Sequence, residues 1–150
     1  MTLYLNIGSN IGDRRSNLLH AVALIKRLPW LYPGTLRISD FVESEPWGFS
    51  SDNTFINVGV AVDIHTGISP IHILDSLLAV QKQINPDTHR DNQGNYIDRV
   101  IDIDIIAIDR LVYSHPRLTI PHPRMHLREF VLKPMRQLAP EWQHPLIKQP

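Results

Sequence analysis

Two aspartates stand two residues apart within an aliphatic segment, Arg99-Val100-Ile101-Asp102-Ile103-Asp104-Ile105-Ile106. The β-branched side chains of this segment predict a buried strand. Side chains at i and i+2 of a strand point to the same face, with roughly 7 Å between their Cα atoms. Asp102 and Asp104 should therefore stand together, which is unfavourable unless a cation holds them. The pair predicts either a site for Mg²⁺ that bridges carboxylates to substrate phosphates, or an edge strand whose polar face meets only water.

Three further side chains near the aspartates could bind phosphate. Arg99 lies at the entrance of the predicted strand, His122 lies in the rigid turn Pro121-His122-Pro123, and Arg128 follows closely. Phosphoryl transfer needs Mg²⁺ to bridge phosphate oxygens and fixed cations to hold the remaining charge. Taken singly, a histidine in such a turn or a lone arginine is more often a surface residue. Their combination with the aspartate pair is what indicates phosphoryl transfer.

The elements that must position these residues follow the order βαββαβ. Hydrophobic periodicity predicts strands over residues 2–7, 35–43, 55–64 and 99–106, and helices over residues 14–28 and 70–84. Asp13 is the expected N-cap of the first helix, and Ser69 that of the second. Gly8-Ser9-Asn10 should break the first strand, and the polar residues 85–98 should form a long mobile loop.

This order predicts an α+β, ferredoxin-like fold, in which an antiparallel sheet carries both helices on one face and short C-terminal elements follow. One sheet face is aliphatic, as the alternation of Val58, Val60 and Val62 illustrates. The other face is polar and aromatic and includes Asn57 and the aspartates. Such a face, if no helix covers it, suits a ligand. The alternative is that the C-terminal elements merely cover it.

Length and composition exclude several classes of protein. A chain of 150 residues predicts one domain spanning 1–150, and we expect a monomer. Fifteen basic and fifteen acidic side chains cancel, which argues against nucleic acid or an anionic membrane as a partner. The absence of cysteine excludes disulfides and thiol catalysis. The N-terminal segment resembles neither a signal peptide nor a membrane span, so we expect a cytoplasmic location.

Four motifs follow one another along nearly the whole chain, from Leu3 to about Pro140. They are Gly8-Ser9-Asn10, Phe55-Ile56-Asn57, Asp98-Arg99-Val100-Ile101-Asp102-Ile103-Asp104, and Leu118-Thr119-Ile120-Pro121-His122-Pro123-Arg124-Met125 continuing through Arg128 and Phe130. Together they resemble the 6-hydroxymethyl-7,8-dihydropterin pyrophosphokinase family of folate biosynthesis. The aspartate motif with the Pro-His motif about twenty residues later is the most specific part.

The resemblance implies transfer of the β,γ-diphosphate of ATP to the hydroxymethyl oxygen of the pterin, with release of AMP. Asp102 and Asp104 would hold two Mg²⁺ ions and would be catalytic together with Arg99 and His122. The residues that match ATP contacts are Gln81, Arg99, Thr119, His122 and Arg128. The residues that match pterin contacts are Ser44, Pro46, Gly48, Phe55, Asn57 and Phe130. Among these, the two phenylalanines would sandwich the ring and Asn57 would read its hydrogen-bonding edge.

The loop after the second helix departs from the family pattern. It reads Asn85-Pro86-Asp87-Thr88-His89-Arg90 where the family usually has Gly-Arg and a further basic residue, and Tyr96 takes the position of a common tryptophan. An acidic residue common near the end of the second helix is not evident. These differences bear on loop closure, and hence on turnover. They leave open a ferredoxin-like module that binds pterin or nucleotide with weak or no catalysis. An RNA-binding domain is a third reading, which the zero net charge argues against.

Overall fold

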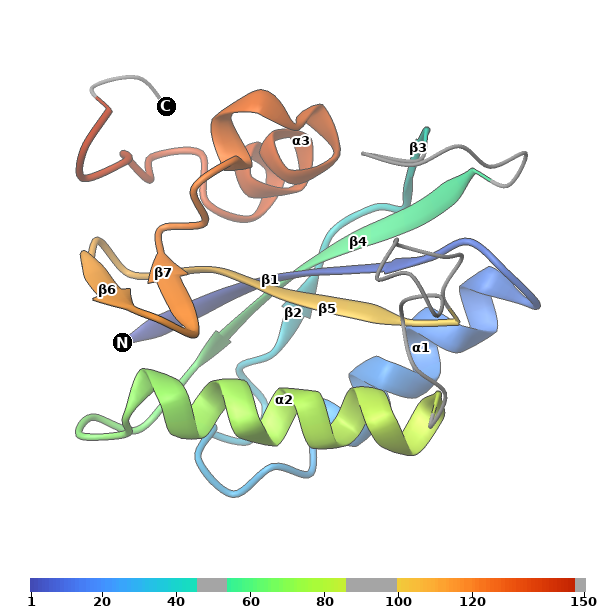
Figure 1. Cartoon of the computed structure of the whole chain (residues 1–150), viewed down its shortest axis with the longest axis horizontal. Coiled ribbons are helices and arrows are strands. Elements are labelled where there is room, and N and C mark those ends of the chain that lie inside the picture. The colour runs from blue at the N-terminus through green and yellow to red at the C-terminus, as the bar shows by residue number, and fades with distance from the viewer. Residues whose placement is uncertain (46–53, 86–99, 148–150) are drawn as a thin grey trace.

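The computed structural model describes residues 1–45, 54–85 and 100–147 (Figure 1). The elements are β1 (Thr2–Ser9), α1 (Arg14–Ile25), β2 (Arg37–Ile38), β3 (Val42–Ser44), β4 (Phe55–Asp63), α2 (Pro70–Ile84), β5 (Asp102–Ile108), β6 (Tyr113–His115), β7 (Leu118–Ile120), the short 3₁₀ helix η1 (Met125–Leu127) and α3 (Glu129–Leu138). Among the described residues, no helix combines the length and apolar character needed to cross a membrane.

The main sheet is antiparallel and has β1 at its centre. Its strand order is β2-β4-β1-β5, and β3 also pairs with β4. A separate hairpin is formed by β6 and β7. The predicted α+β class is confirmed, and the antiparallel sheet is consistent with an open ferredoxin-like fold.

Helices α1 and α2 lie on the same side of the sheet, as predicted (Figure 1). Between them and the strands lies a core of aliphatic side chains that includes Leu3, Ile7, Val58, Ile73 and Leu77.

The helix caps were predicted in part. The carboxylate of Asp13 accepts a hydrogen bond of 3.1 Å from the backbone N–H of Ser16, as expected for the N-cap of α1. Ser69 occupies the N-cap position of α2, but its side chain makes no capping hydrogen bond. Helix α1 ends three residues before the predicted position. The reason is that Arg27 and Leu28 bond to carbonyls three residues back, which is a 3₁₀ turn.

The expectation that no helix covers the second face of the sheet is wrong for part of that face. Helix α3 packs on this side, opposite α1 and α2 (Figure 1), where Val131 and Met135 form one buried cluster with Tyr4 and Ala61. Gly59 permits the close approach, because a Cβ there would lie 2.5 Å from the Cβ of Pro134. The C-terminal segment therefore contributes a full helix as well as short elements, and Asn57 and Asp102 lie on the same face near the end of β1.

Several strand boundaries also differ from the prediction. The strand expected over 35–43 is two strands, because the register against β4 shifts by one residue between β2 and β3. In that interval the Ser39 hydroxyl accepts a hydrogen bond of 2.8 Å from the N–H of Gly59. Gly8 and Ser9 do not break β1 but are its last residues. Strand β5 begins at Asp102 and extends to Ile108, past the predicted end.

Candidate active site

The strand register brings the polar side chains together at one end of the sheet. Gly8 on β1 is opposite Asp102 on β5 and Asn57 on β4, and two residues earlier Asn6 is opposite Asp104 and Gly59. Asp102 and Asp104 are half-buried and alternate with buried isoleucines, so both lie on the face that also receives α3.

Gly8 leaves room for two of the predicted pterin contacts. A Cβ at this position would lie 2.9 Å from Oδ1 of Asn57 and 3.2 Å from Cδ1 of Phe55. Phe55 and Asn57 therefore lie beside the C-terminal end of β1, and Asn57 is in the same row as Asp102. The glycine in this motif serves close approach within a strand rather than a turn.

Asn57 is held rigidly by strand β3. Its side chain is 2% exposed, and its Nδ2 donates to the carbonyl oxygen of Val42 at 3.1 Å and to Oγ of Ser44 at 2.8 Å. Both N–H groups of the amide are thus used within the protein. The carbonyl oxygen Oδ1 is the part of this side chain that can accept a hydrogen bond from a ligand.

Phe130 lies in the first turn of α3 and is joined to the sheet by Asn6. The Nδ2 of Asn6 donates a hydrogen bond of 2.9 Å to the backbone oxygen of Phe130. The guanidinium of Arg128, the residue before α3, lies 5.7 Å from the centre of the Phe130 ring, which is within the range of a cation–π contact. The first turn of α3 thus places one aromatic ring and one cation beside the row that carries Asp104.

His122 is fixed next to β5 as a neutral hydrogen-bond donor. Its backbone N–H donates to the carbonyl oxygen of Ile106, two residues beyond Asp104. Its Nδ1 accepts a hydrogen bond of 3.1 Å from the backbone N–H of Arg124. Burial, and then the charges of Arg128 and Arg124, lower the pKa of His122 to about 4. At neutral pH the proton is therefore on Nε2, which can donate to an anion.

Gln81 reaches from α2 to the exposed edge of β5. It is 9% exposed, and its Oε1 accepts a hydrogen bond of 2.9 Å from the N–H of Ile103, the residue between the two aspartates. Among the described residues, β5 is the last strand of the sheet and pairs there with β1. Its outer N–H groups therefore need other acceptors. Gln81 thus holds the aspartate strand in place, which the sequence did not indicate.

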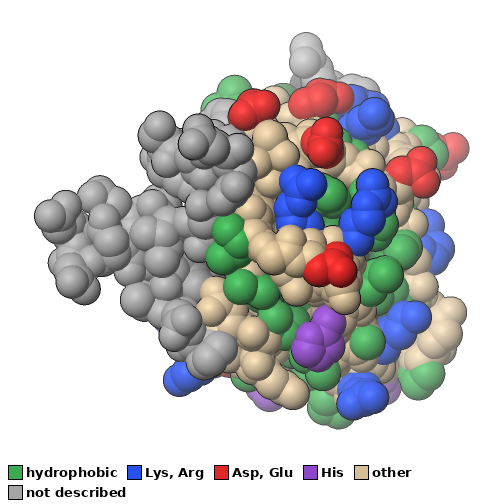
Figure 2. Space-filling model, turned by 90° about the vertical axis from the view of Figure 1, so that its right-hand side faces the viewer, with side chains coloured by type: hydrophobic (Ala, Val, Ile, Leu, Met, Phe, Trp, Pro, Cys, Tyr) green, Lys and Arg blue, Asp and Glu red, His purple; other side chains and the backbone are tan. Residues whose placement is uncertain are grey.

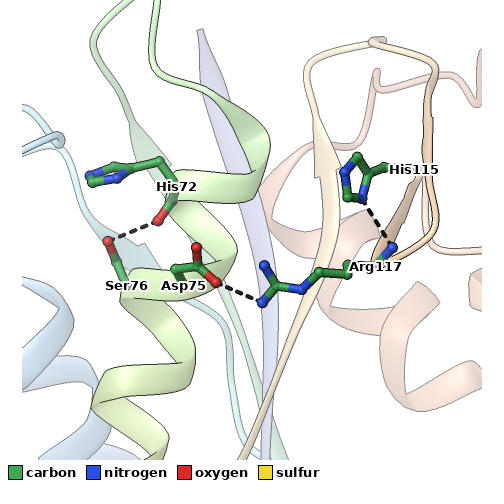
Figure 3. A network of polar contacts seen from close by, with 5 residues as sticks. All are labelled: His72, Asp75, Ser76, His115 and Arg117. Atoms are coloured by element: carbon green, nitrogen blue, oxygen red, sulfur yellow. Dashed lines mark hydrogen bonds and ion pairs between the residues drawn. The ribbon is translucent and has the colours of Figure 1, made fainter.

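Thr119 is exposed on the β6–β7 hairpin, where it pairs with Ser114. Figure 3 shows how this hairpin is attached to α2: the side chain of Arg117 extends to Asp75, with Nη2 and Oδ1 2.6 Å apart, and its backbone N–H donates to Nδ1 of His115. In the same view the hydroxyl of Ser76 donates to the carbonyl oxygen of His72. The ion pair thus joins the hairpin that carries Thr119 to α2.

Three predicted site residues, Pro46, Gly48 and Arg99, lie outside the described residues, as do residues 86–98 of the predicted loop. Of the other predicted residues, Asn57 and Asp102 are opposite Gly8 near the end of β1 and Phe55 lies beside it, whereas Gln81 lies on α2 and Thr119 on the separate β6–β7 hairpin. Asn6 and Arg117 were not predicted as site residues. A polar residue inside an otherwise aliphatic strand could have drawn attention to Asn6, whereas nothing local distinguishes Arg117.

The side chains available as metal ligands suit Mg²⁺ better than a metal ion that takes all of its ligands from the protein. Over the described ranges there is no group of three or more His, Asp or Glu side chains that could hold a metal ion. Asp102 and Asp104 supply carboxylate oxygens from one face of one strand. Mg²⁺ usually takes one or two carboxylates and completes its octahedron with water and substrate phosphates. Two half-buried carboxylates are consistent with that mode of binding.

Charges of opposite sign are mixed on the molecular surface. Figure 2 shows a face on which basic and acidic side chains of the described residues lie among one another rather than gathering by sign. This agrees with the formal net charge of zero.

Comparisons with known proteins agree with one another. The family model described as 7,8-dihydro-6-hydroxymethylpterin-pyrophosphokinase (HPPK) matches residues 4–140. The 2-amino-4-hydroxy-6-hydroxymethyldihydropteridine pyrophosphokinase of Porphyromonas gingivalis is 40% identical over 147 residues, covering 95% of this chain and 93% of the relative. The Bacillus subtilis protein of the same name is 32% identical over 136 residues, covering 91% and 77%. The bifunctional protein FolKE of Lactococcus lactis subsp. lactis is 36% identical over 137 residues, covering 91% of this chain and 37% of the relative.

Proposed function

The chain belongs to the 7,8-dihydro-6-hydroxymethylpterin-pyrophosphokinase family, and we propose that the polar end of its sheet is where the family's reaction takes place. The protein is a transferase of folate biosynthesis that moves diphosphate from ATP to hydroxymethyldihydropterin. The pterin hydroxyl forms a bond to the β-phosphorus, the bond from that phosphorus to the α-phosphate oxygen breaks, and AMP leaves. The site must therefore hold a polyanion and a flat heterocycle side by side.

Asp102 and Asp104 would be the metal ligands. The family uses ATP as co-substrate and typically Mg²⁺, and we propose two ions bound by this pair of carboxylates. Mg²⁺ bound there would supply Lewis-acid chemistry, acidifying the pterin hydroxyl and neutralising charge near the leaving AMP. The two carboxylates lie on one face of β5, and Gln81 fixes the backbone between them. Gln81 would thereby help to hold the two carboxylates in register.

Arg128 and His122 would bind the phosphates of ATP. His122 is neutral and carries its proton on Nε2, so it binds an anion as a hydrogen-bond donor. Arg128 supplies a permanent positive charge near the same face. Arg99, together with Gln81 and Thr119, would complete the nucleotide contacts. In this proposal the turn that follows β7 and the residue before α3 bind the phosphates of ATP beside the aspartates.

Phe55 and Phe130 would hold the pterin ring between them. They lie far apart in the sequence, and each is anchored beside β1, Phe55 next to Gly8 and Phe130 through Asn6. The Asn57 carbonyl oxygen would accept a hydrogen bond from the edge of the ring, while Ser44 keeps the amide oriented. Pro46 and Gly48 would contribute from the following loop. Stacking plus a few fixed polar groups is what a flat, amide-like heterocycle requires.

The observation that best supports this arrangement is the single row in which Asp102, Gly8 and Asn57 are opposite one another across three strands. Asp102, on the proposed phosphate side, therefore lies two strand spacings from Asn57, on the proposed pterin side. Each strand spacing is about 4.8 Å. We further propose that residues 1–150 act as one domain with ATP and the pterin as small-molecule partners.

The direct test incubates the protein with ATP, Mg²⁺ and 6-hydroxymethyl-7,8-dihydropterin and separates the nucleotides by chromatography. AMP and the pterin diphosphate should form in equal amounts. Formation of ADP instead would contradict the proposal. Tight binding of both substrates by calorimetry without AMP would show instead a module that binds without catalysis, the possibility raised by the altered loop at residues 85–90.

A further inference from the structure

We propose that Asn6 is a positioning residue for the transfer reaction, because it fixes Phe130 relative to the strand that lies beside Asp104. This inference rests on the proposed function, in which Phe130 stacks on the pterin and Asp104 binds metal.

Asn6 is a polar residue in the middle of the central strand. It is 4% exposed, and its neighbours across the sheet are Gly59 on β4 and Asp104 on β5. A buried amide requires hydrogen-bond partners. The partner that the structure gives to its Nδ2 is the backbone oxygen of Phe130 at 2.9 Å, 124 residues away in the chain. The hydrogen bond therefore serves to connect two elements rather than to stabilise either one locally.

This hydrogen bond acts on the turn of α3 that carries the ligand-binding groups. Phe130 is the second residue of α3, and Arg128 lies immediately before the helix with its guanidinium over the Phe130 ring. The acceptor is a backbone atom, so the bond restrains the main chain from which the ring projects. The rate of a reaction falls strongly when the reacting atoms are displaced by about 1 Å. Asn6 is thus placed to set the separation between the pterin ring and the carboxylates.

Helix α3 has a second tether of the same kind at its other end, which provides a matched control. Nη1 of Arg37 donates a hydrogen bond of 3.1 Å to the backbone oxygen of Leu138, the last residue of α3. Both tethers join a sheet side chain to a backbone carbonyl of α3. Of the two tethers, that of Asn6 lies in the row that contains Asp104. Arg37 is opposite Ala61, which lies two residues beyond Gly59 along β4.

The test compares steady-state kinetics and thermal melting of Asn6→Ala and Arg37→Met. Asn6→Ala should raise the KM for the pterin by about five- to tenfold, the size expected for one hydrogen bond, with the KM for ATP changed less than about twofold. Both variants should lower Tm by similar amounts, because each removes one tether of α3. Arg37→Met, however, should leave both KM values within about twofold of the wild type. If Asn6→Ala does not fold, Asn6→Leu retains most of the side-chain volume while removing the donor, and the same comparison applies.

Phe130→Ala separates failure of this inference from failure of the proposed function. If Phe130→Ala raises the pterin KM while Asn6→Ala lowers only Tm, Asn6 merely supports the fold and the inference is overturned. If Phe130→Ala leaves the pterin KM unchanged, the assignment of Phe130 to the pterin is itself wrong, and the role of Asn6 falls with it.

Discussion

The pH dependence of stability should report the environment of His122. Burial is the main cause of the lowered pKa of this imidazole, and the charges of Arg128 and Arg124 add to it. In the unfolded chain the pKa returns to 6.5, whereas in the folded protein it is about 4. A depressed folded-state pKa means that the unfolded state binds the proton first. The contribution to stability is therefore fully present above pH 6.5 and is lost as the pH falls towards 4.

The magnitude follows from the size of the pKa shift. Each pKa unit corresponds to 1.36 kcal/mol, so a fall from 6.5 to about 4 corresponds to a loss of about 3 kcal/mol of unfolding free energy. This is a large part of the total stability of an ordinary domain, which is about 5–15 kcal/mol. Other groups, mainly carboxylates, also titrate in this range, so the effect must be measured as a difference between two variants.

The assay is urea unfolding of the wild type and His122→Gln at several pH values from 7 to 4. The free energy of the wild type minus that of the variant should fall by about 3 kcal/mol over this range, because the variant has no imidazole to protonate. An NMR titration of the His122 ring should give a midpoint near 4. A difference that stays constant with pH, together with an NMR midpoint near 6.5, would refute the argument.

Three further outcomes are expected. Asp104→Ala should reduce AMP formation by about 100-fold or more, and chelation of Mg²⁺ should have the same effect on the wild type. The Tm should change by only a few degrees, because the substitution removes one of two like charges. An equal loss of activity and stability would argue against a role in metal binding. Gly59→Ala should destabilise the fold by about 1–3 kcal/mol in urea unfolding, since the new Cβ would lie 2.5 Å from Cβ of Pro134; unchanged stability would mean that α3 packs less closely. Gln81→Leu should cost about 1–3 kcal/mol because the N–H of Ile103 loses its acceptor; a change in ATP affinity alone would show that Gln81 contacts only nucleotide.

Local patterns in the sequence were sufficient for most elements. The alternation of β4, the Asp13 cap of α1 and the proline at the start of α2 each depend on residues within one or two turns. The same holds for Asp102 and Asp104, whose common face follows from strand periodicity alone. The errors lie where a neighbouring element overrides the local pattern, as with Gly8, which is a strand residue because β4 and β5 pair with it on both sides.

The sequence alone determined the residue types of the site, the α+β class, and the family resemblance that indicates the chemistry. The tertiary structure decided the packing of α3 on the second sheet face, the tether from Asn6 to Phe130, the use of Gln81 as an acceptor for β5, and the protonation state of His122. These depend on burial and on contacts between residues as far as 124 positions apart. Such properties arise only when the elements pack together, because neither periodicity nor spacing encodes the distance between two elements.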